Sequence, residues 1–126
     1  MEKFQTIKDI IFLPKKYYNG NSSPYAILKA SGYFEWHDKI NENDIFEVLT
    51  QHLECINQWL CFSADKRCCG WYFTEEKGKN IVGNYSSQGG YEQVIEFLDK
   101  IEACAAFIKR EIEEIRDTEK EQERPQ

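Results

Sequence analysis

Apolar and polar positions alternate with a helical period through the first half of the chain and with a strand period later. Between residues 41 and 62, apolar side chains recur at steps of three and four, which predicts one long amphipathic helix. Its apolar stripe comprises Ile45, Val48, Leu49, His52, Leu53, Ile56, Trp59 and Leu60. Asn41 is the expected N-cap, and the acids that follow it oppose the helix dipole.

Shorter elements are predicted before this helix. Helical spacing is found at Phe4, Ile7, Ile10 and Ile11. This favours a short amphipathic helix closed by Pro14, and the alternative is an edge strand over residues 10–13. Residues 15–21 are predicted to be a loop because turn-forming residues lie at their end. A two-turn helix should then begin at the cap Ser23, with proline in its first turn, and stop at Gly32 in a left-handed conformation.

Three runs rich in aromatic and β-branched side chains follow, at residues 69–74, 80–85 and 91–97. The turns between them contain glycine, so the pattern predicts an antiparallel meander. Strand alternation places Tyr91, Ile95 and Phe97 on one face of the third run. It places Glu92 and Glu96 on the other face.

A last amphipathic helix is predicted from about Asp99 to Ile115, with a capping-box-like start formed by Asp99 and Glu102. Its buried stripe is Ile101, Cys104, Ala105, Ile108, Ile112 and Ile115. A small sheet needs cover on one face, and this helix can supply it. The fold class is therefore α+β: N-terminal helices, a three-stranded antiparallel β-meander and a long C-terminal helix packed on the sheet.

Length and charge limit the domain organisation and the partners. A chain of 126 residues suits a single domain, which we assign to residues 1–116. Residues 117–126 carry no apolar side chain and are expected to be solvated helix or a disordered, charged tail. Acidic side chains number 22 and basic ones 16, which gives a net charge of −6. Because affinity for nucleic acid comes mostly from Lys and Arg, this balance disfavours nucleic acid and favours solubility and fast capture of a basic protein.

The sequence indicates no export and no membrane association. The N-terminus lacks the apolar core of a secretory signal, and the apolar group at residues 10–13 is only four residues long. A cytoplasmic location is expected.

The cysteines are Cys55, Cys61, Cys68, Cys69 and Cys104. Five thiols cannot all pair with one another, which argues against a secreted disulfide scaffold. Their spacings also differ from the close cysteine pairs of structural zinc sites, although His52 lies near two of them. We predict five reduced thiols and neither a metal nor another cofactor.

Residues 33–39 interleave three aromatics with two acids and a histidine. Phe34 and Trp36 could simply fill the core. His37 and Asp38 could form a catalytic pair, but the side chains of sequence neighbours diverge and no nucleophile motif accompanies them. We therefore expect no enzymatic activity. Aromatics surrounded by charge are typical of protein interfaces, and the candidate partner-binding residues are Glu35, Trp36, Asp38, Glu42, Glu47, Glu75 and Glu76.

Three segments carry a resemblance to a known family: residues 28–40 (LKASGYFEWHDKI), 70–73 (GWYF) and 103–113 (ACAAFIKREIE). They resemble bacterial polymorphic-toxin immunity proteins, in particular those of contact-dependent growth inhibition systems. The resemblance implies a cytoplasmic protein that binds the C-terminal domain of its cognate toxin, often a basic nuclease, and blocks its active site. It assigns no contact residues, because these differ between cognate pairs. A general interaction or regulatory adaptor and a small enzyme or metal-binding protein are the alternatives.

Overall fold

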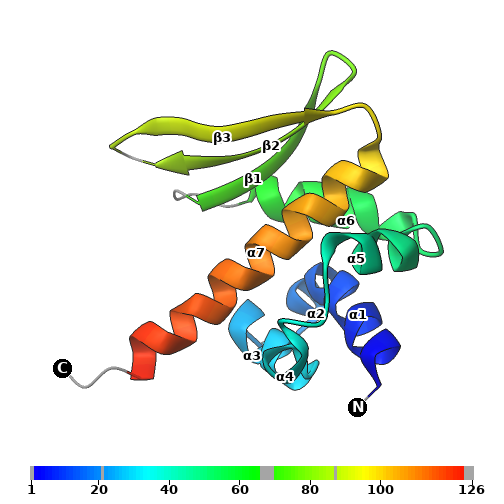
Figure 1. Ribbon diagram of the computed structural model, residues 1–126, viewed down its shortest axis with the longest axis vertical. Coiled ribbons are helices and arrows are strands. Elements are labelled where there is room, and N and C mark those ends of the chain that lie inside the picture. Colours follow the sequence, from blue (N-terminus) through cyan, green and yellow to red (C-terminus); the bar gives the residue numbers. More distant parts are fainter. Residues whose placement is uncertain (1, 21, 66–69, 87, 124–126) are drawn as a thin grey trace.

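The computed structural model describes residues 2–20, 22–65, 70–86 and 88–123. Six helices come first, namely α1 (Lys3–Ile11), α2 (Leu13–Asn19), α3 (Pro24–Ala30), α4 (Tyr33–Trp36), α5 (Glu42–Leu49) and α6 (Glu54–Ala64). Three strands, β1 (Gly70–Glu76), β2 (Lys79–Ser86) and β3 (Gly90–Phe97), and helix α7 (Lys100–Glu123) follow (Figure 1).

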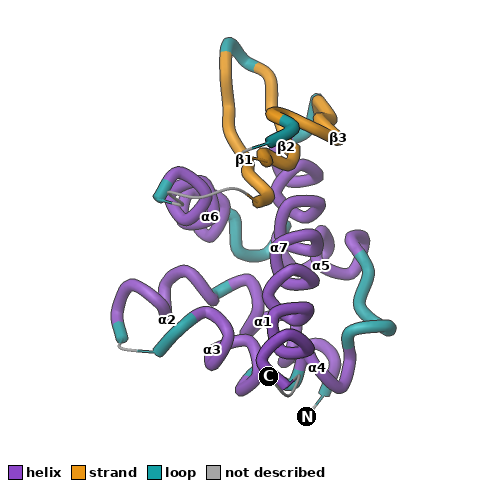
Figure 2. The backbone as a smooth tube through the Cα atoms, turned by 90° about the vertical axis from the view of Figure 1, so that its left-hand side faces the viewer, coloured by secondary structure: helices purple, strands orange, loops and turns teal. Residues whose placement is uncertain are grey.

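The strands form one antiparallel sheet in the order β1-β2-β3, so the predicted meander is confirmed. Helix α7 contacts all three strands along one face of the sheet. It then continues past α5 and α6 to α3, so it joins the sheet to the helical part of the molecule (Figures 1 and 2). The predicted α+β class, with the last helix packed on the sheet, is therefore confirmed. Helix α7 is longer than predicted and reaches Glu123.

The core lies where α7 meets the other elements. Trp59 of α6, Phe73 of β1 and Phe107 of α7 are almost completely buried. The ring centroid of Phe107 lies 6.0 Å from that of Trp59 and 5.9 Å from that of Phe73. This cluster therefore connects a helix, a strand and α7 through direct ring contacts.

Several local signals form as the sequence predicts. Ser23 caps α3 by accepting a hydrogen bond from the amide of Ala26 at 3.1 Å. Gly32 adopts a φ of 88°, the left-handed conformation in which glycine has no Cβ penalty. Asn41 caps α5 and forms a reciprocal capping box with Asp44.

The long helix predicted over residues 41–62 is wrong, because it is divided into α5 and α6. At the break, the amides of Gln51 and His52 bond to carbonyls three residues back, and the Thr50 hydroxyl donates to the Glu47 carbonyl at 2.6 Å. These tighter bonds end α5 and rotate the following residues relative to the apolar stripe. As a result Leu53, predicted to be buried, is 53% exposed.

The N-terminal segment forms two helices, which excludes the edge strand that was the alternative for residues 10–13. The predicted loop is wrong for residues 15–19, since α2 continues to Asn19, and residue 21 lies outside the described residues. Pro14 follows the end of α1 and lies in the first turn of α2. A helix needs no amide donor in its first turn, so proline is compatible with the start of α2.

Strand β3 departs from simple alternation. Val82 pairs with Ile95 and Asn84 pairs with Glu92, so two residues of β3 lie opposite Gly83 alone. Gln93 in this bulge has a φ of 52°. An extra residue reverses the side-chain order along the strand. Tyr91 therefore lies on the face opposite to Ile95, and the prediction that they share a face is wrong.

Candidate functional site

The structure separates the predicted partner-binding acids into two regions. Glu42 forms an ion pair with Arg110 of α7 at 2.8 Å, and Glu75 forms one with Lys100 at the start of α7 at 2.8 Å. Ten residues of helix span about 15 Å. The acids of residues 35–47 and those at the β1–β2 turn therefore lie far apart along α7.

Within each region the residues differ in what their side chains contact. Glu35, Asp38 and Glu47 are exposed on the helical part of the molecule. Trp36 is half-buried, packs against the core and has the Lys39 amine 5.8 Å from its ring centroid. Glu76 is exposed at the end of β1 and lines a hollow on the sheet. Only Glu76 among the seven predicted residues lines this hollow.

The three segments that carry the family resemblance meet at α7. The Lys109 amine donates hydrogen bonds to the Tyr33 hydroxyl at 2.7 Å and to the His37 carbonyl at 2.9 Å. The guanidinium of Arg110 lies 5.5 Å from the ring centroid of Trp71. Burial raises the pKa of Tyr33 and lowers the pKa of Lys109. These contacts lie within the chain, so the three segments contribute to its internal packing.

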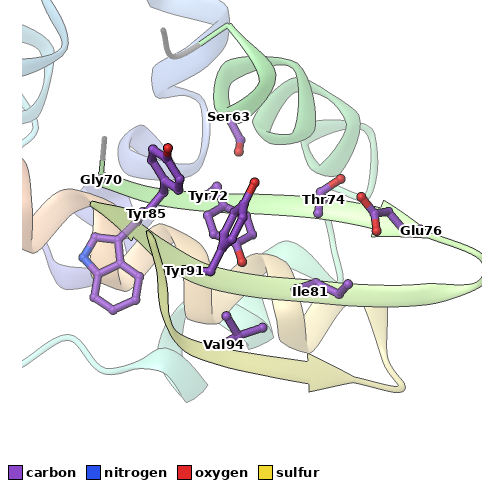
Figure 3. A pocket seen from close by; sticks show the side chains of 10 residues that line it. Ser63, Gly70, Tyr72, Thr74, Glu76, Ile81, Tyr85, Tyr91 and Val94 are labelled. Atoms are coloured by element: carbon purple, nitrogen blue, oxygen red, sulfur yellow. The ribbon is translucent and has the colours of Figure 1, made fainter. Parts of the chain in front are cut away.

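The face of the sheet turned away from α7 holds a hollow of about 580 Å³. Its lining residues come from all three strands and the end of α6, and they are Ser63, Gly70, Trp71, Tyr72, Thr74, Glu76, Ile81, Tyr85, Tyr91 and Val94. Figure 3 shows the tyrosines gathered at one end of the sheet, with Thr74, Glu76 and Ile81 toward the β1–β2 turn. We call this surface the open face.

Three tyrosines form an aromatic cluster on the open face. The ring centroid of Tyr91 lies 5.7 Å from that of Tyr72 and 5.0 Å from that of Tyr85. Tyr91 is 71% exposed and Val94 is 48% exposed. Aromatic and aliphatic side chains left this exposed on a shared surface are typical of a protein-binding site.

Gly83 positions Tyr72 within this cluster. A Cβ atom at Gly83 would lie 2.6 Å from the Tyr72 hydroxyl oxygen and 2.9 Å from Cζ, so the ring lies directly across the glycine. The backbone of Gly83 has no positive φ, so the close approach of the ring, and not the backbone conformation, accounts for glycine here.

The charge of the open face is acidic. Glu76 is the charged residue that lines the hollow in the described part of the chain. Glu96 faces the same side, since it pairs with Ile81, and its carboxylate lies 3.7 Å from the Lys79 amine. Burial raises the pKa of Tyr72, and the charges of Tyr91 and Glu76 raise it further, so this phenol stays neutral in physiological conditions.

Sequence reasoning identified Glu76 but missed the tyrosines. The available signal was the Lys77-Gly78 turn, in which both residues have positive φ values of 50° and 79°. Such a two-residue turn sets the register of a hairpin. The turn pairs Glu76 with Lys79, and this register places Tyr72 and Tyr85 on the face opposite to Phe73. Nothing in the sequence indicates the bulge that turns Tyr91 to the same side.

The described cysteines are free thiols in contrasting surroundings, whereas Cys68 and Cys69 lie outside the described residues. Cys61 is exposed and Cys55 and Cys104 are buried. Burial raises the pKa of Cys55 to about 11 and also raises that of Cys104. Across the described ranges, no three His, Cys, Asp or Glu side chains are grouped to hold a metal ion.

We expect N-ethylmaleimide to modify Cys61 in the folded protein at least about a hundredfold faster than Cys55 or Cys104, because the thiolate is the reactive form. Peptide mass spectrometry after a short pulse of reagent measures this. Equal labelling of Cys61 and Cys104 would contradict the burial argument. Fewer than five reactive thiols after denaturation without reductant would contradict the prediction that all are reduced.

Within the described ranges, no helix combines the length and the apolar character needed to cross a bilayer. Comparisons with models of known families, with curated proteins and with solved structures found no match for this chain.

Proposed function

We propose that this chain is an immunity protein that binds the C-terminal domain of a cognate toxin in the cytoplasm. The toxin is a basic nuclease of a contact-dependent growth inhibition system, and the chain neutralises it by covering its active site. The observation that carries the proposal is the open face, where Tyr72, Tyr85 and Tyr91 border a hollow beside acidic side chains.

The composition of the open face suits binding of a folded protein. Tyrosine is enriched at interface centres because it offers a large, stiff ring together with a hydrogen-bonding hydroxyl. The net charge of −6 complements a basic nuclease and speeds its capture. An inhibitor of this kind acts by obstruction, so we propose that the chain itself performs no catalysis.

The family resemblance adds support from a different part of the molecule. Its three segments contact one another through Lys109 with Tyr33 and through Arg110 with Trp71. A shared scaffold with a differing binding surface is what immunity proteins require, because each must match its own toxin. The tyrosines of the open face, apart from Tyr72, lie outside these segments.

The test is neutralisation of the toxin domain encoded beside this chain. We expect cells that express the toxin domain to stop growing and to recover fully when this chain is co-expressed. With purified proteins, nuclease activity should disappear at a molar ratio of about one to one. A matched toxin variant without nuclease activity measures binding independently of growth.

Two results would reject the proposal. If the chain binds the toxin domain but leaves its nuclease activity unchanged, obstruction of the active site is wrong. If no binding occurs and growth is not restored, the chain is not the immunity protein of that toxin, and the adaptor interpretation replaces it.

A further inference from the structure

We infer that the open face recognises a basic surface of the partner, with arginine or lysine side chains packed against Tyr72, Tyr85 and Tyr91 and neighbouring basic side chains paired by Glu76 and Glu96 toward the β1–β2 turn. The inference rests on the proposed function, since it names the chemistry that the same surface recognises. It also moves the centre of binding from the acids of residues 35–47 to the sheet.

Ring geometry is the first argument. The Tyr91 ring is inclined by 81° to that of Tyr72 and by 59° to that of Tyr85, so the three rings pack on one another and expose differently oriented surfaces. A cation within about 6 Å of a ring centroid is attracted to the face of the ring. The protein already uses this contact internally, since the Lys109 amine lies 5.1 Å from the Tyr33 centroid.

Charge is the second argument. Glu76 lines the hollow and Glu96 lies on the same face, and Lys79 lies between them, opposite Glu76 in the strand pairing and 3.7 Å from the Glu96 carboxylate. A partner with several basic side chains would therefore meet the tyrosine rings at one end of the face and carboxylates toward the β1–β2 turn. A charge-assisted hydrogen bond to a carboxylate is about twice as strong as one between neutral groups.

The same charges disfavour a second copy of the chain as the occupant. A second copy would present the same two acids and one lysine, Lys79, that this face carries, and each chain carries a net charge of −6. Like charges in an interface cost free energy, whereas a basic partner gains it. The occupant is thus a different, cationic protein surface.

Apolar neighbours complete the site. Val94 is 48% exposed and Ile81 is partly exposed on the same face. Arginine and lysine side chains carry three or four methylene groups that pack along apolar surface while the charge remains hydrated. The open face therefore offers separate contacts for the stem and for the charged head of such a side chain.

The defined probe is tetra-arginine amide, and its neutral isostere tetra-citrulline amide is the control peptide. We expect tetra-arginine to shift the NMR resonances of Tyr72, Tyr85 and Tyr91 and tetra-citrulline to shift none of them. Tyr91→Ala should weaken tetra-arginine binding about tenfold, the effect of losing one desolvated cation–π contact. Phe4→Ala is the matched control, since Phe4 is a 50% exposed aromatic residue on α1.

Gly83→Ala provides a second variant that deletes no side chain. Its added methyl group would displace the Tyr72 ring, while the strand backbone remains compatible with alanine. We expect retained folding and a loss of tetra-arginine binding similar to that of Tyr91→Ala. Folding is checked by circular dichroism and thermal unfolding of each variant.

Three outcomes would overturn the inference: shifts confined to residues 35–47, equal binding of both peptides, or a concentration-dependent dimer in sedimentation equilibrium that Tyr91→Ala abolishes. Failure of the proposed function is recognised separately. Tetra-arginine bound at the tyrosines without neutralisation of the toxin keeps the inference and rejects the function. Neutralisation that survives both Tyr91→Ala and Gly83→Ala keeps the function and rejects the inference.

Discussion

Replacing Trp59 with alanine is expected to lower the free energy of unfolding by about 3–5 kcal/mol, the range typical of large aromatic side chains removed from a core. Trp59 is fully buried, and its ring packs edge-on against Phe62 at 5.4 Å and Phe107 at 6.0 Å. Its indole Nε1 also donates a hydrogen bond to the Ile11 carbonyl at 3.0 Å. Ile11 ends α1, so this carbonyl is one of those that a helix end leaves without an intrahelical donor.

Trp59→Phe separates packing from hydrogen bonding. It keeps most of the ring volume but removes the donor, so we expect a loss of about 1–3 kcal/mol from the unpaired carbonyl and the smaller ring. Guanidinium unfolding followed by far-ultraviolet circular dichroism measures both variants. An unchanged midpoint for Trp59→Ala would show that α6 does not hold the N-terminal helices through this contact.

Reversing the charge of the open face is expected to weaken toxin binding about 30-fold or more. The variant Glu76→Lys with Glu96→Lys places two positive charges on the same face as the tyrosines, where the proposed partner brings its own. Truncating or opposing a desolvated interface charge costs about 2–5 kcal/mol, and the lower value corresponds to about 30-fold in Kd. Glu75 is left unchanged because its ion pair with Lys100 links β1 to α7.

The matched control reverses the exposed acids of the helical part, Glu35, Asp38 and Glu47. Glu42 is left in place because it pairs with Arg110. We expect this variant to slow association and to reduce its dependence on salt while the dissociation rate stays the same, since rim charges act mainly on encounter. Surface plasmon resonance at several salt concentrations measures both rates. If both folded variants neutralise the toxin as well as the parent does, the electrostatic mechanism is wrong.

Signals confined to a few neighbouring residues are those that the sequence determines by itself. The cap at Ser23, the left-handed Gly32, the cap at Asn41 and the glycine-containing turns all appear where the pattern predicts them. Each depends on the conformational preference of one residue or on a hydrogen bond to a residue three positions away. The runs of aromatic and β-branched residues were likewise enough to predict that three strands exist, and the apolar period was enough to predict α7.

Tertiary packing decided where periodic elements are interrupted. The apolar stripe continues through residues 50–53, yet α5 and α6 separate there. In the resulting arrangement His52 packs edge-on against Phe12, with ring centroids 5.2 Å apart, and the Trp59 indole donates to the Ile11 carbonyl. Each of these contacts joins positions at least 40 residues apart. A pattern read within one helix contains no information about them.

The same distinction governs the candidate site. The sequence placed acidic residues correctly on the surface, because charge alone keeps them there. It could not place Tyr91, because the face of the sheet on which Tyr91 lies depends on the bulge at Gln93. A left-handed residue in such a bulge costs about 1–2 kcal/mol. Strand pairing on both sides of the bulge and the contacts of Tyr91 with Tyr72 and Tyr85 offset this cost. Three strands must therefore assemble before the open face exists, and only the tertiary structure brings its tyrosines together.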